Sequence, residues 1–143
     1  MSFSPEIAKQ VANLPIPECA KTLGIEIRGY DAARREVTIT AQGRNAFRNP
    51  MGAVQGGFLC AMLDDAMALA AVFASGFQIV VPTLEMKVTF FSPAQPGTIN
   101  GIGRVARLGK TIAFLEGELL NEAGEVLAKA SATARVAPMP GRG

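Results

Sequence analysis

The sequence predicts one strand-rich α+β domain of 143 residues. That length is enough for one full hydrophobic core and too short for two. A long apolar run from Phe58 to Phe73 has the length of a helix, and several later runs alternate apolar with polar residues, as strands do. The predicted order is a first hairpin, one long helix and then a series of antiparallel strands, which indicates the α+β class.

The N-terminal segment predicts short helices. Residues 4–22 are expected to form one or two of them, with Ser4 as the N-cap and Pro5 at the first helical position. Pro15 and Pro17 predict a break within this segment.

The next part predicts a hairpin and the long helix. Residues 25–30 and 36–41 alternate apolar with polar and predict two strands, with a turn at 31–35. After a loop, the helix is expected to run from residue 56 to 74 and to stop at Ser75-Gly76, because glycine commonly follows the end of a helix.

Four runs after the helix predict strands, at residues 83–91, 98–107, 111–121 and 125–136. In the first run, one face carries Leu84, Met86, Val88 and Phe90, and the other carries Thr83, Glu85, Lys87 and Thr89. One face of the last run has only small side chains, at Val126, Ala128, Ala130, Ala132 and Ala134. Such a face would let the central helix approach closely. Residues 138–143 are expected to be a flexible tail.

The composition is apolar for a soluble monomer, with 49% hydrophobic residues and a mean hydropathy of +0.25. Charged residues interrupt the apolar runs before about 20 residues, so we expect no membrane span, and the surplus apolar surface predicts contact between subunits. A net charge of +2 gives no reason to expect nucleic acid. The first residues lack the basic-then-apolar order of a secretion signal, which predicts a cytoplasmic protein.

The chain contains no histidine and only two cysteines. Catalysis by a Ser-His-Asp or Cys-His arrangement is therefore excluded, as are the common zinc sites, and no metal is expected. Any proton transfer must fall to Asp, Glu, Lys, Tyr30, a cysteine or water.

The start of the long helix carries the most informative motif. Gly56 and Gly57 follow Gln55, and the first N–H groups of a helix have no partner within it. These donors, at the positive end of the helix dipole, suit a negatively charged oxygen. Further along, Asp64 stands among apolar residues, where an acid is costly unless it has a partner or a use. Adjacent helical residues point about 100° apart, so only one of Asp64 and Asp65 faces a given cleft.

From Gln55 to Ala66 the sequence reads Gln-Gly-Gly-x-x-x-x-Met-x-Asp-x-Ala, with Asn49 six residues upstream. This stretch resembles the hotdog-fold acyl-CoA thioesterases, in particular the phenylacetate-pathway and thioesterase-superfamily-member-2 type, whose motif is His-Gly-Gly followed by Leu-x-Asp-x-Ala. The resemblance covers residues 20–137. It implies an antiparallel sheet wrapped around one long central helix, and hydrolysis of aryl- or medium-chain acyl-CoA thioesters to a carboxylate and coenzyme A.

The family motif implies a role for each matching residue. The Gly56 N–H would donate to the oxyanion, Asp64 would act as the nucleophile or as the general base that activates water, and Asn49 would position the acyl carbonyl or the water. Asp65 would be a cap or ion-pair residue instead. Gln55 stands where the family commonly has histidine, so a positioning role remains and a proton-transfer role does not.

Two further regions are candidates for the site, the first by resemblance and the second by charge. The Thr83 hydroxyl would hold the attacking water, unless this threonine is present only for its β propensity. Gly57 and the turn with Arg107, Gly109 and Lys110 are expected to bind the substrate. The phosphates of coenzyme A need cationic partners, and the late strands also offer Arg104 and Arg135. Surface solubility explains any single basic residue equally well.

The spacing of the motif predicts that two chains share each site. Asp64 lies roughly 12 Å along the helix axis from Gly56, too far for one thioester carbonyl to reach both groups easily. We therefore expect a homodimer or homotetramer with shared sites, as in the family, and no cofactor, since coenzyme A is part of the substrate. Hotdog dehydratases depend on a catalytic histidine, which this chain lacks. The alternative is a non-catalytic acyl-CoA-binding module or a structural oligomer.

Overall fold

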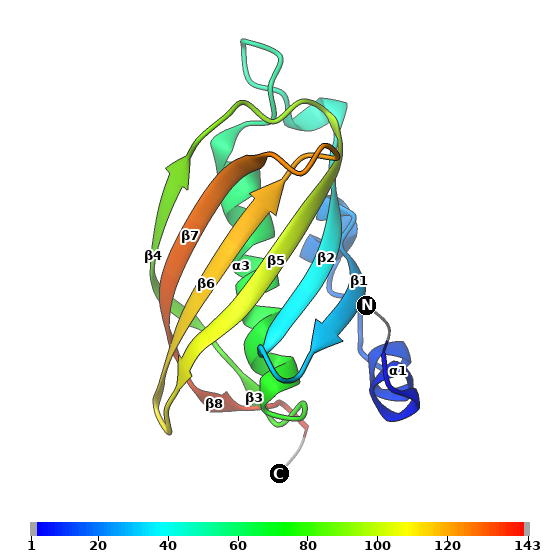
Figure 1. Ribbon diagram of the computed structural model, residues 1–143, viewed down its shortest axis with the longest axis vertical. Helices are drawn as coiled ribbons and strands as arrows, with labels where there is room; N and C mark the ends of the chain where they lie inside the picture. Colours follow the sequence, from blue (N-terminus) through cyan, green and yellow to red (C-terminus); the bar gives the residue numbers. More distant parts are fainter. Residues whose placement is uncertain (1–2, 142–143) are drawn as a thin grey trace.

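One antiparallel sheet wraps one long helix in the computed structural model, which describes residues 3–141 (Figure 1). The helices are α1 (Pro5–Ala12), α2 (Glu18–Leu23), the short 3-10 helix η1 (Asn45–Phe47) and α3 (Gly56–Ala74). The strands are β1 (Glu26–Asp31), β2 (Glu36–Gly43), β3 (Ile79–Val80), β4 (Thr83–Phe90), β5 (Gly97–Leu108), β6 (Ile112–Leu120), β7 (Val126–Arg135) and β8 (Ala137–Pro138). The large sheet has the order β1-β2-β5-β6-β7-β4. This confirms the predicted α+β class and the hotdog arrangement.

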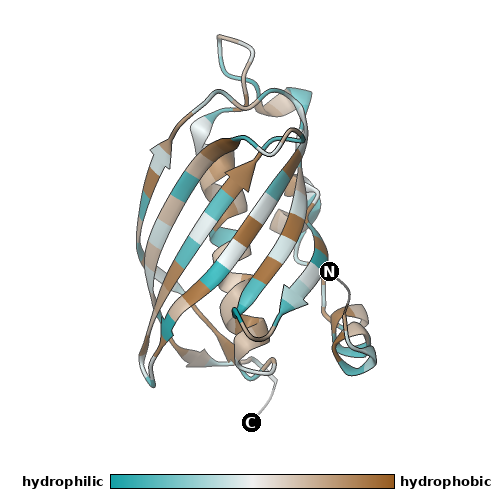
Figure 2. Ribbon diagram, in the orientation of Figure 1, coloured by the Kyte–Doolittle hydropathy of each residue, from teal (hydrophilic) through white to brown (hydrophobic). Residues whose placement is uncertain are grey.

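α3 begins and ends at the predicted residues. Gln55 caps its start, and after Ser75 the chain turns at Gly76, which lies in the left-handed region with φ +65°. By length and composition α3 is also apolar enough to span a membrane, with a mean hydropathy of 1.7, so the expectation that no segment reaches this level is wrong. Here the sheet covers the helix, and half of its apolar segment is buried. Figure 2 shows hydrophobic and hydrophilic bands alternating along the strands, because only one face of the sheet packs on α3.

The helix backbone lies directly against the sheet at Gly103 in β5. A Cβ atom added there would stand 1.9 Å from the carbonyl oxygen of Ala66, so only glycine lets the α3 backbone come this near. In β6, a Cβ atom on Gly117 would stand 3.0 Å from the Met67 side chain. The small residues of β7 do face inward, but α3 packs mainly over β5 and β6. The expectation that β7 receives the helix is therefore wrong, since small side chains permit a close approach without causing one.

Aromatic rings close the C-terminal end of α3. Phe73 contacts the rings of Phe3, Tyr30 and Phe77, with centroids separated by 6.2, 5.1 and 4.8 Å. These contacts tie the N-terminal segment and β1 to the end of the helix. The predicted break between two short N-terminal helices is confirmed, because α1 and α2 are separate elements.

The first part of the predicted flexible tail is held in place. The short strands β3 and β8, which the sequence did not predict, pair with each other, so Pro138 lies opposite Ile79. The Met139 N–H then donates to the carbonyl oxygen of Gln78 over 2.9 Å. The prediction is therefore wrong for residues 138 and 139, and residues 142 and 143 lie outside the described residues.

β4 is an exposed edge of the large sheet. It pairs on one side only, with β7. Its side chains are open to solvent along most of the strand, and the apolar Leu84 and Phe90 are 61% and 51% exposed. An edge with unpaired backbone groups and exposed apolar side chains is a template for another chain.

The outer face of the sheet is polar and internally paired. Glu36, Arg104 and Glu116 lie opposite one another on neighbouring strands, and Arg104 Nη2 is 2.6 Å from Glu36 Oε2. This hydrogen bond raises the pKa of Arg104. In the next row, Lys129 pairs with Glu118 over 3.2 Å. The shallow hollow of about 370 Å³ over these rows is therefore a solvated surface whose charges are largely matched within the chain.

Gly103→Ala should destabilise the protein strongly, because the added methyl group collides with helix backbone that cannot rotate away. We expect the free energy of unfolding in urea to fall by about 3 kcal/mol. Gly101→Ala is the matched control on the same strand and face, where the methyl group would meet the Ile39 side chain at 2.7 Å, so a smaller loss is expected. Equal losses in the two variants would contradict the close approach of the helix backbone.

Candidate active site

The first turn of α3 leaves one backbone donor free. The Gln55 N–H donates to the Phe47 carbonyl oxygen over 2.8 Å, and the Phe58 N–H donates to the Gln55 carbonyl oxygen over 3.0 Å. The Gln55 side chain caps the helix, because its Oε1 accepts from the Gly57 N–H over 2.8 Å. The Gly56 N–H has no acceptor within residues 3–141. It remains as a free donor at the positive end of the helix dipole.

Gly57 makes this cap possible. A Cβ atom on Gly57 would stand 2.7 Å from Gln55 Oε1, so a side chain there would displace the cap. Because the Gly57 amide is already engaged, its predicted contact with the substrate stays a prediction. The rings of Phe47 and Phe58 stack before and after the cap, with centroids 4.0 Å apart and planes 8° apart, and they fix the direction in which the chain enters the helix.

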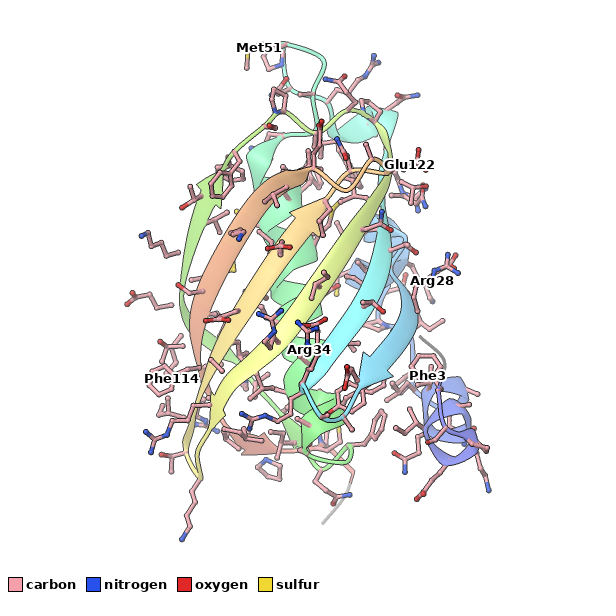
Figure 3. All side chains as sticks on the ribbon, viewed as in Figure 1. Phe3, Arg28, Arg34, Met51, Phe114 and Glu122 are labelled. Atoms are coloured by element: carbon pink, nitrogen blue, oxygen red, sulfur yellow. The ribbon has the colours of Figure 1, made fainter. Side chains whose placement is uncertain are left out.

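Asn49 builds the loop that precedes α3. Its Oδ1 accepts hydrogen bonds from the N–H groups of Met51 (2.9 Å) and Ala53 (3.1 Å). Its own N–H donates to the Ala53 carbonyl oxygen over 2.7 Å. The loop projects from one end of the molecule, with Met51 at its tip (Figure 3). Only the Nδ2 donors of Asn49 are left for a substrate, so its predicted role beside the acyl carbonyl stays a prediction.

Asp64 is held by Thr83. The Thr83 hydroxyl donates to Asp64 Oδ1 over 2.6 Å, which joins the middle of α3 to the start of β4. This hydrogen bond fixes the orientation of the carboxylate and engages one of its two oxygens. The structure thus brings together two of the predicted site residues, although a water held by Thr83 stays a prediction.

A β-bulge turns Thr83 toward the helix. Thr83 pairs with the buried Ala134, whereas Glu85 pairs with Thr133, and the register shifts between Thr83 and Glu85. The expectation that Thr83 and Glu85 share a face is therefore wrong. Strict alternation fails at the bulge, because the extra residue inverts the side on which the preceding side chain points.

Asp65 has no partner among the described residues. It lies in the middle of α3 and forms neither an ion pair nor a side-chain hydrogen bond there, so the expected cap or ion-pair role is wrong. Burial, and to a lesser extent the neighbouring Asp64 carboxylate, raise the pKa of Asp65 to about 6. The helix therefore carries one anchored carboxylate and, next to it, one unpaired carboxylate.

The basic turn predicted to bind substrate lies at the same end of the sheet as Thr83. One register row across the sheet contains Thr83, Ala134, Ala113 and Leu108. The turn is thus three strands from Thr83, roughly 14 Å at the usual strand spacing. Arg107, Gly109 and Lys110 are exposed, and neither cation forms an ion pair in the part of the chain that the structure describes. The structure does not bring them into contact with Asp64.

Few other described groups compete for the chemistry. Burial raises the pKa of the Cys60 thiol, which lowers its thiolate fraction. Burial also raises the pKa of Tyr30, whose ring packs against Phe73 at the far end of α3. Within residues 3–141 there is no group of three side chains able to hold a metal ion.

The sequence did not predict that Phe90 meets the start of α3. A Cβ atom added to Gly56 would stand 3.0 Å from Phe90 Cζ, so the tip of the ring faces the residue with the free amide. Alternation along β4 indicated the face of the strand on which Phe90 lies. Which side chain of that face meets the helix depends on how strand and helix cross, and no local pattern records that.

The chain matches the family model described as Thioesterase superfamily over residues 51–128, a range that contains Gly56, Asp64 and Thr83. The chain belongs to the thioesterase superfamily. A phenylacetic acid degradation-related protein from Ralstonia eutropha JMP134 is 34% identical, with a TM-score of 0.83 over 90% of this chain and 97% of that one. This similarity confirms the predicted resemblance to the phenylacetate-pathway type.

Two more distantly related structures share the fold of the present chain. The PaaI protein from the phenylacetic acid degradation operon of E. coli is 21% identical, with a TM-score of 0.77 over 93% of this chain and 92% of that one. A hypothetical thioesterase protein with coenzyme A, from Streptococcus pneumoniae TIGR4, is 21% identical, with a TM-score of 0.71 over 80% of this chain and 87% of that one. No curated protein sequence matches the chain.

Asp65→Asn should stabilise the protein at neutral pH. The pKa of Asp65 is about 6 in the folded chain, against an ordinary value of 3.8, so the fold favours the protonated carboxyl. Its contribution to stability is complete below pH 3.8 and is lost as the pH rises through 6. A fully buried carboxyl with this shift would lose about 3 kcal/mol, but water still reaches Asp65, so we expect a gain of about 1 kcal/mol from the amide.

Thermal unfolding at several pH values checks this. The Tm of Asp65→Asn should exceed that of the wild type at pH 8, and the difference should vanish near pH 4. Glu122→Gln, in an exposed turn at the surface (Figure 3), is the matched control and should give no pH-dependent difference. A constant difference across this pH range would mean that the amide acts through packing and not through the charge.

Proposed function

We propose that this thioesterase-superfamily protein hydrolyses acyl-CoA thioesters, with aryl or medium-chain acyl groups, to a free carboxylate and coenzyme A. The proposal rests on the Asp64 carboxylate, fixed by the Thr83 hydroxyl at 2.6 Å, on the same helix whose first turn offers the free Gly56 amide. Membership of the superfamily supports hydrolysis of a thioester. The similar protein from Streptococcus pneumoniae, whose structure contains coenzyme A, supports the choice of acyl-CoA.

Two groups are sufficient because a thioester is already activated. Its carbonyl carbon is electrophilic and its thiolate leaves readily. A backbone N–H at the start of a helix stabilises the negative charge that develops on the carbonyl oxygen. Asp64 either takes a proton from an attacking water or attacks the carbonyl carbon to give an anhydride that water then hydrolyses. Both routes consume one water molecule, and coenzyme A leaves as the thiol.

Gln55 holds the donor in place in this scheme. Its side chain takes up the Gly57 amide, which leaves the Gly56 amide as the free donor of the first turn. A carboxamide neither gains nor loses a proton at ordinary pH, so Gln55 positions groups and transfers no proton.

Two chains complete each site. Asp64 and the Gly56 amide lie about 12 Å apart along α3, too far for one carbonyl. A second copy would use the β4 edge, whose backbone groups are unpaired on one side and whose Leu84 and Phe90 are exposed. Antiparallel pairing of two β4 strands about a two-fold axis would place the two α3 helices side by side in opposite directions. Asp64 of one chain would then approach the Gly56 amide of the other.

The phosphates of coenzyme A would bind at the β5–β6 turn. Arg107 and Lys110 are exposed there and form no ion pair within residues 3–141. The turn itself requires Gly109, because a Cβ atom there would stand 2.9 Å from the Ile112 carbonyl oxygen. The turn lies at the same end of the sheet as the Thr83–Asp64 pair, so a long ligand bound at Asp64 can extend toward it.

The purified protein should release thiol from a panel of aryl- and medium-chain acyl-CoA substrates. Asp64→Asn should lower kcat by about 1,000-fold while Tm and oligomeric state are kept, because amide and acid are nearly isosteric. Thr83→Val should lower kcat by roughly 10- to 100-fold, because the carboxylate loses its orientation.

Asp65→Asn is the matched control and should retain turnover. Equal rates for the wild type and Asp64→Asn would refute the assignment of Asp64. A wild-type protein that binds acyl-CoA without releasing thiol would instead be a non-catalytic binding module.

A single substitution can remove the Gly56 donor and leave all other side chains of the candidate site in place. In Gly56→Pro the N–H is absent, and proline suits the first position of a helix; Gln55 has φ −64° and ψ 139°, as a residue before proline requires. We expect kcat to fall by about 100- to 1,000-fold. Gly56→Ala keeps the N–H and adds a similar Cβ atom beside Phe90, so it is the matched control and should be much more active.

The same variant tests whether sites are shared. Mixed dimers of Asp64→Asn and Gly56→Pro chains would contain one site with both defects and one intact site. Equal mixing should therefore restore about one quarter of the wild-type activity if each site draws on two chains. No recovery after demonstrated subunit exchange would show that each site lies within one chain.

A further inference from the structure

Phe90, the last residue of β4, lies beside the N-terminal end of α3. The atoms nearest to a Cβ placed on Gly56 are its ring atoms Cζ, Cε1 and Cε2, at 3.0, 3.3 and 3.6 Å. The ring therefore points its tip at the residue whose amide has no acceptor within residues 3–141. An aromatic side chain in this position would contact any ligand that binds to that amide.

The ring stays beside the helix start although it is 51% exposed. Across the ladder it pairs with Ala128, which is buried and too small to cover it. The next residue, Phe91, is 58% exposed and lies just beyond the end of β4. The three atoms nearest to a Cβ placed on Gly56 all belong to the Phe90 ring and none to Phe91.

An acyl carbonyl bound to the Gly56 amide would bring its substituents against this ring. The carbonyl oxygen would lie about 2.9 Å from the Gly56 nitrogen. The Cβ position lies about 2.5 Å from the same nitrogen by standard geometry, so the ring tip is at most roughly 5.5 Å from it. The carbonyl carbon and the first atoms attached to it fall within the same range of distances, so the ring limits the space around them.

We propose that Phe90 determines which acyl groups the site accepts, an inference that rests on the proposed acyl-CoA hydrolysis. A flat aryl group or an unbranched chain can lie along the ring face, where aromatic and apolar contacts are favourable. A quaternary carbon next to the carbonyl projects methyl groups in every direction, and one of them meets the ring tip. The preferred substrates are therefore acyl-CoA thioesters whose first acyl carbon is aryl or unbranched.

Phe90→Leu removes the ring tip and keeps an apolar side chain on the strand. The experiment compares kcat/KM for 2,2-dimethylpropanoyl-CoA with kcat/KM for butanoyl-CoA. In Phe90→Leu this ratio should rise about tenfold or more over the wild type, which is the effect of relieving a clash of one methyl group in a pocket. Phe91→Leu is the matched control, because it makes the same substitution at a similarly exposed ring, and it should leave the ratio unchanged.

The outcomes separate this inference from the proposed function. A wild-type protein that releases thiol from none of the acyl-CoA probes would refute the function itself. An active wild type whose ratio is the same in Phe90→Leu, or is changed equally by Phe91→Leu, would overturn the role of Phe90. Light scattering checks that Phe90→Leu keeps the wild-type assembly; if it does not, Phe90→Met, which is closer in volume to phenylalanine and more flexible, should show the same rise in the ratio.

Discussion

The contact between α3 and β5 at Gly103 fixes the position of the whole site. Because a Cβ atom at Gly103 would overlap the Ala66 carbonyl, the helix backbone rests directly on the strand. Ala66 lies two residues after Asp64, so this contact sets the depth at which the carboxylate sits above the sheet. A hydrogen bond as short as that from Thr83 to Asp64 requires this depth to be accurate to a fraction of an ångström. A glycine with no functional group of its own thus helps to determine whether the carboxylate is held.

A single rigid helix carries both groups of the proposed site, and this is the reason for proposing that a second chain completes it. The free Gly56 donor lies at the first turn of α3, at the positive end of the helix dipole, and the Asp64 carboxylate lies about two turns later. No bending of α3 can bring the two together without breaking its hydrogen bonds. The exposed β4 edge, with Thr83 at its start and Phe90 at its end, offers a second chain the contact that would supply the missing half.

Local chemistry predicted the individual elements of the fold, and the family resemblance predicted that the sheet wraps the helix. The particular contacts between elements were not predicted. Both ends of α3 were predicted, because Gln55-Gly56-Gly57 marks its start and Ser75-Gly76 marks its end. The resemblance selected Asp64, and the structure gives it a partner. The bulge before Glu85, the unpaired state of Asp65 and the crossing of α3 over β5 depend on neighbours that are remote in sequence. Phe90 belongs to the same class, because its place beside Gly56 follows from the crossing of strand and helix.

Gln55 caps α3 where the family commonly has histidine, and these two side chains respond differently to pH. A neutral imidazole can accept a hydrogen bond from an amide N–H and a protonated one cannot, whereas a carboxamide accepts at every pH. The cap on Gly57, and with it the direction of the free Gly56 amide, is therefore independent of pH. The neighbour of Asp64 behaves differently, because the pKa of Asp65 is about 6. Above that pH the helix carries a second negative charge beside Asp64, which opposes the negative charge of an oxyanion bound nearby. The positive end of a second α3 helix would offset this charge, which is a further electrostatic reason for a site formed by two chains.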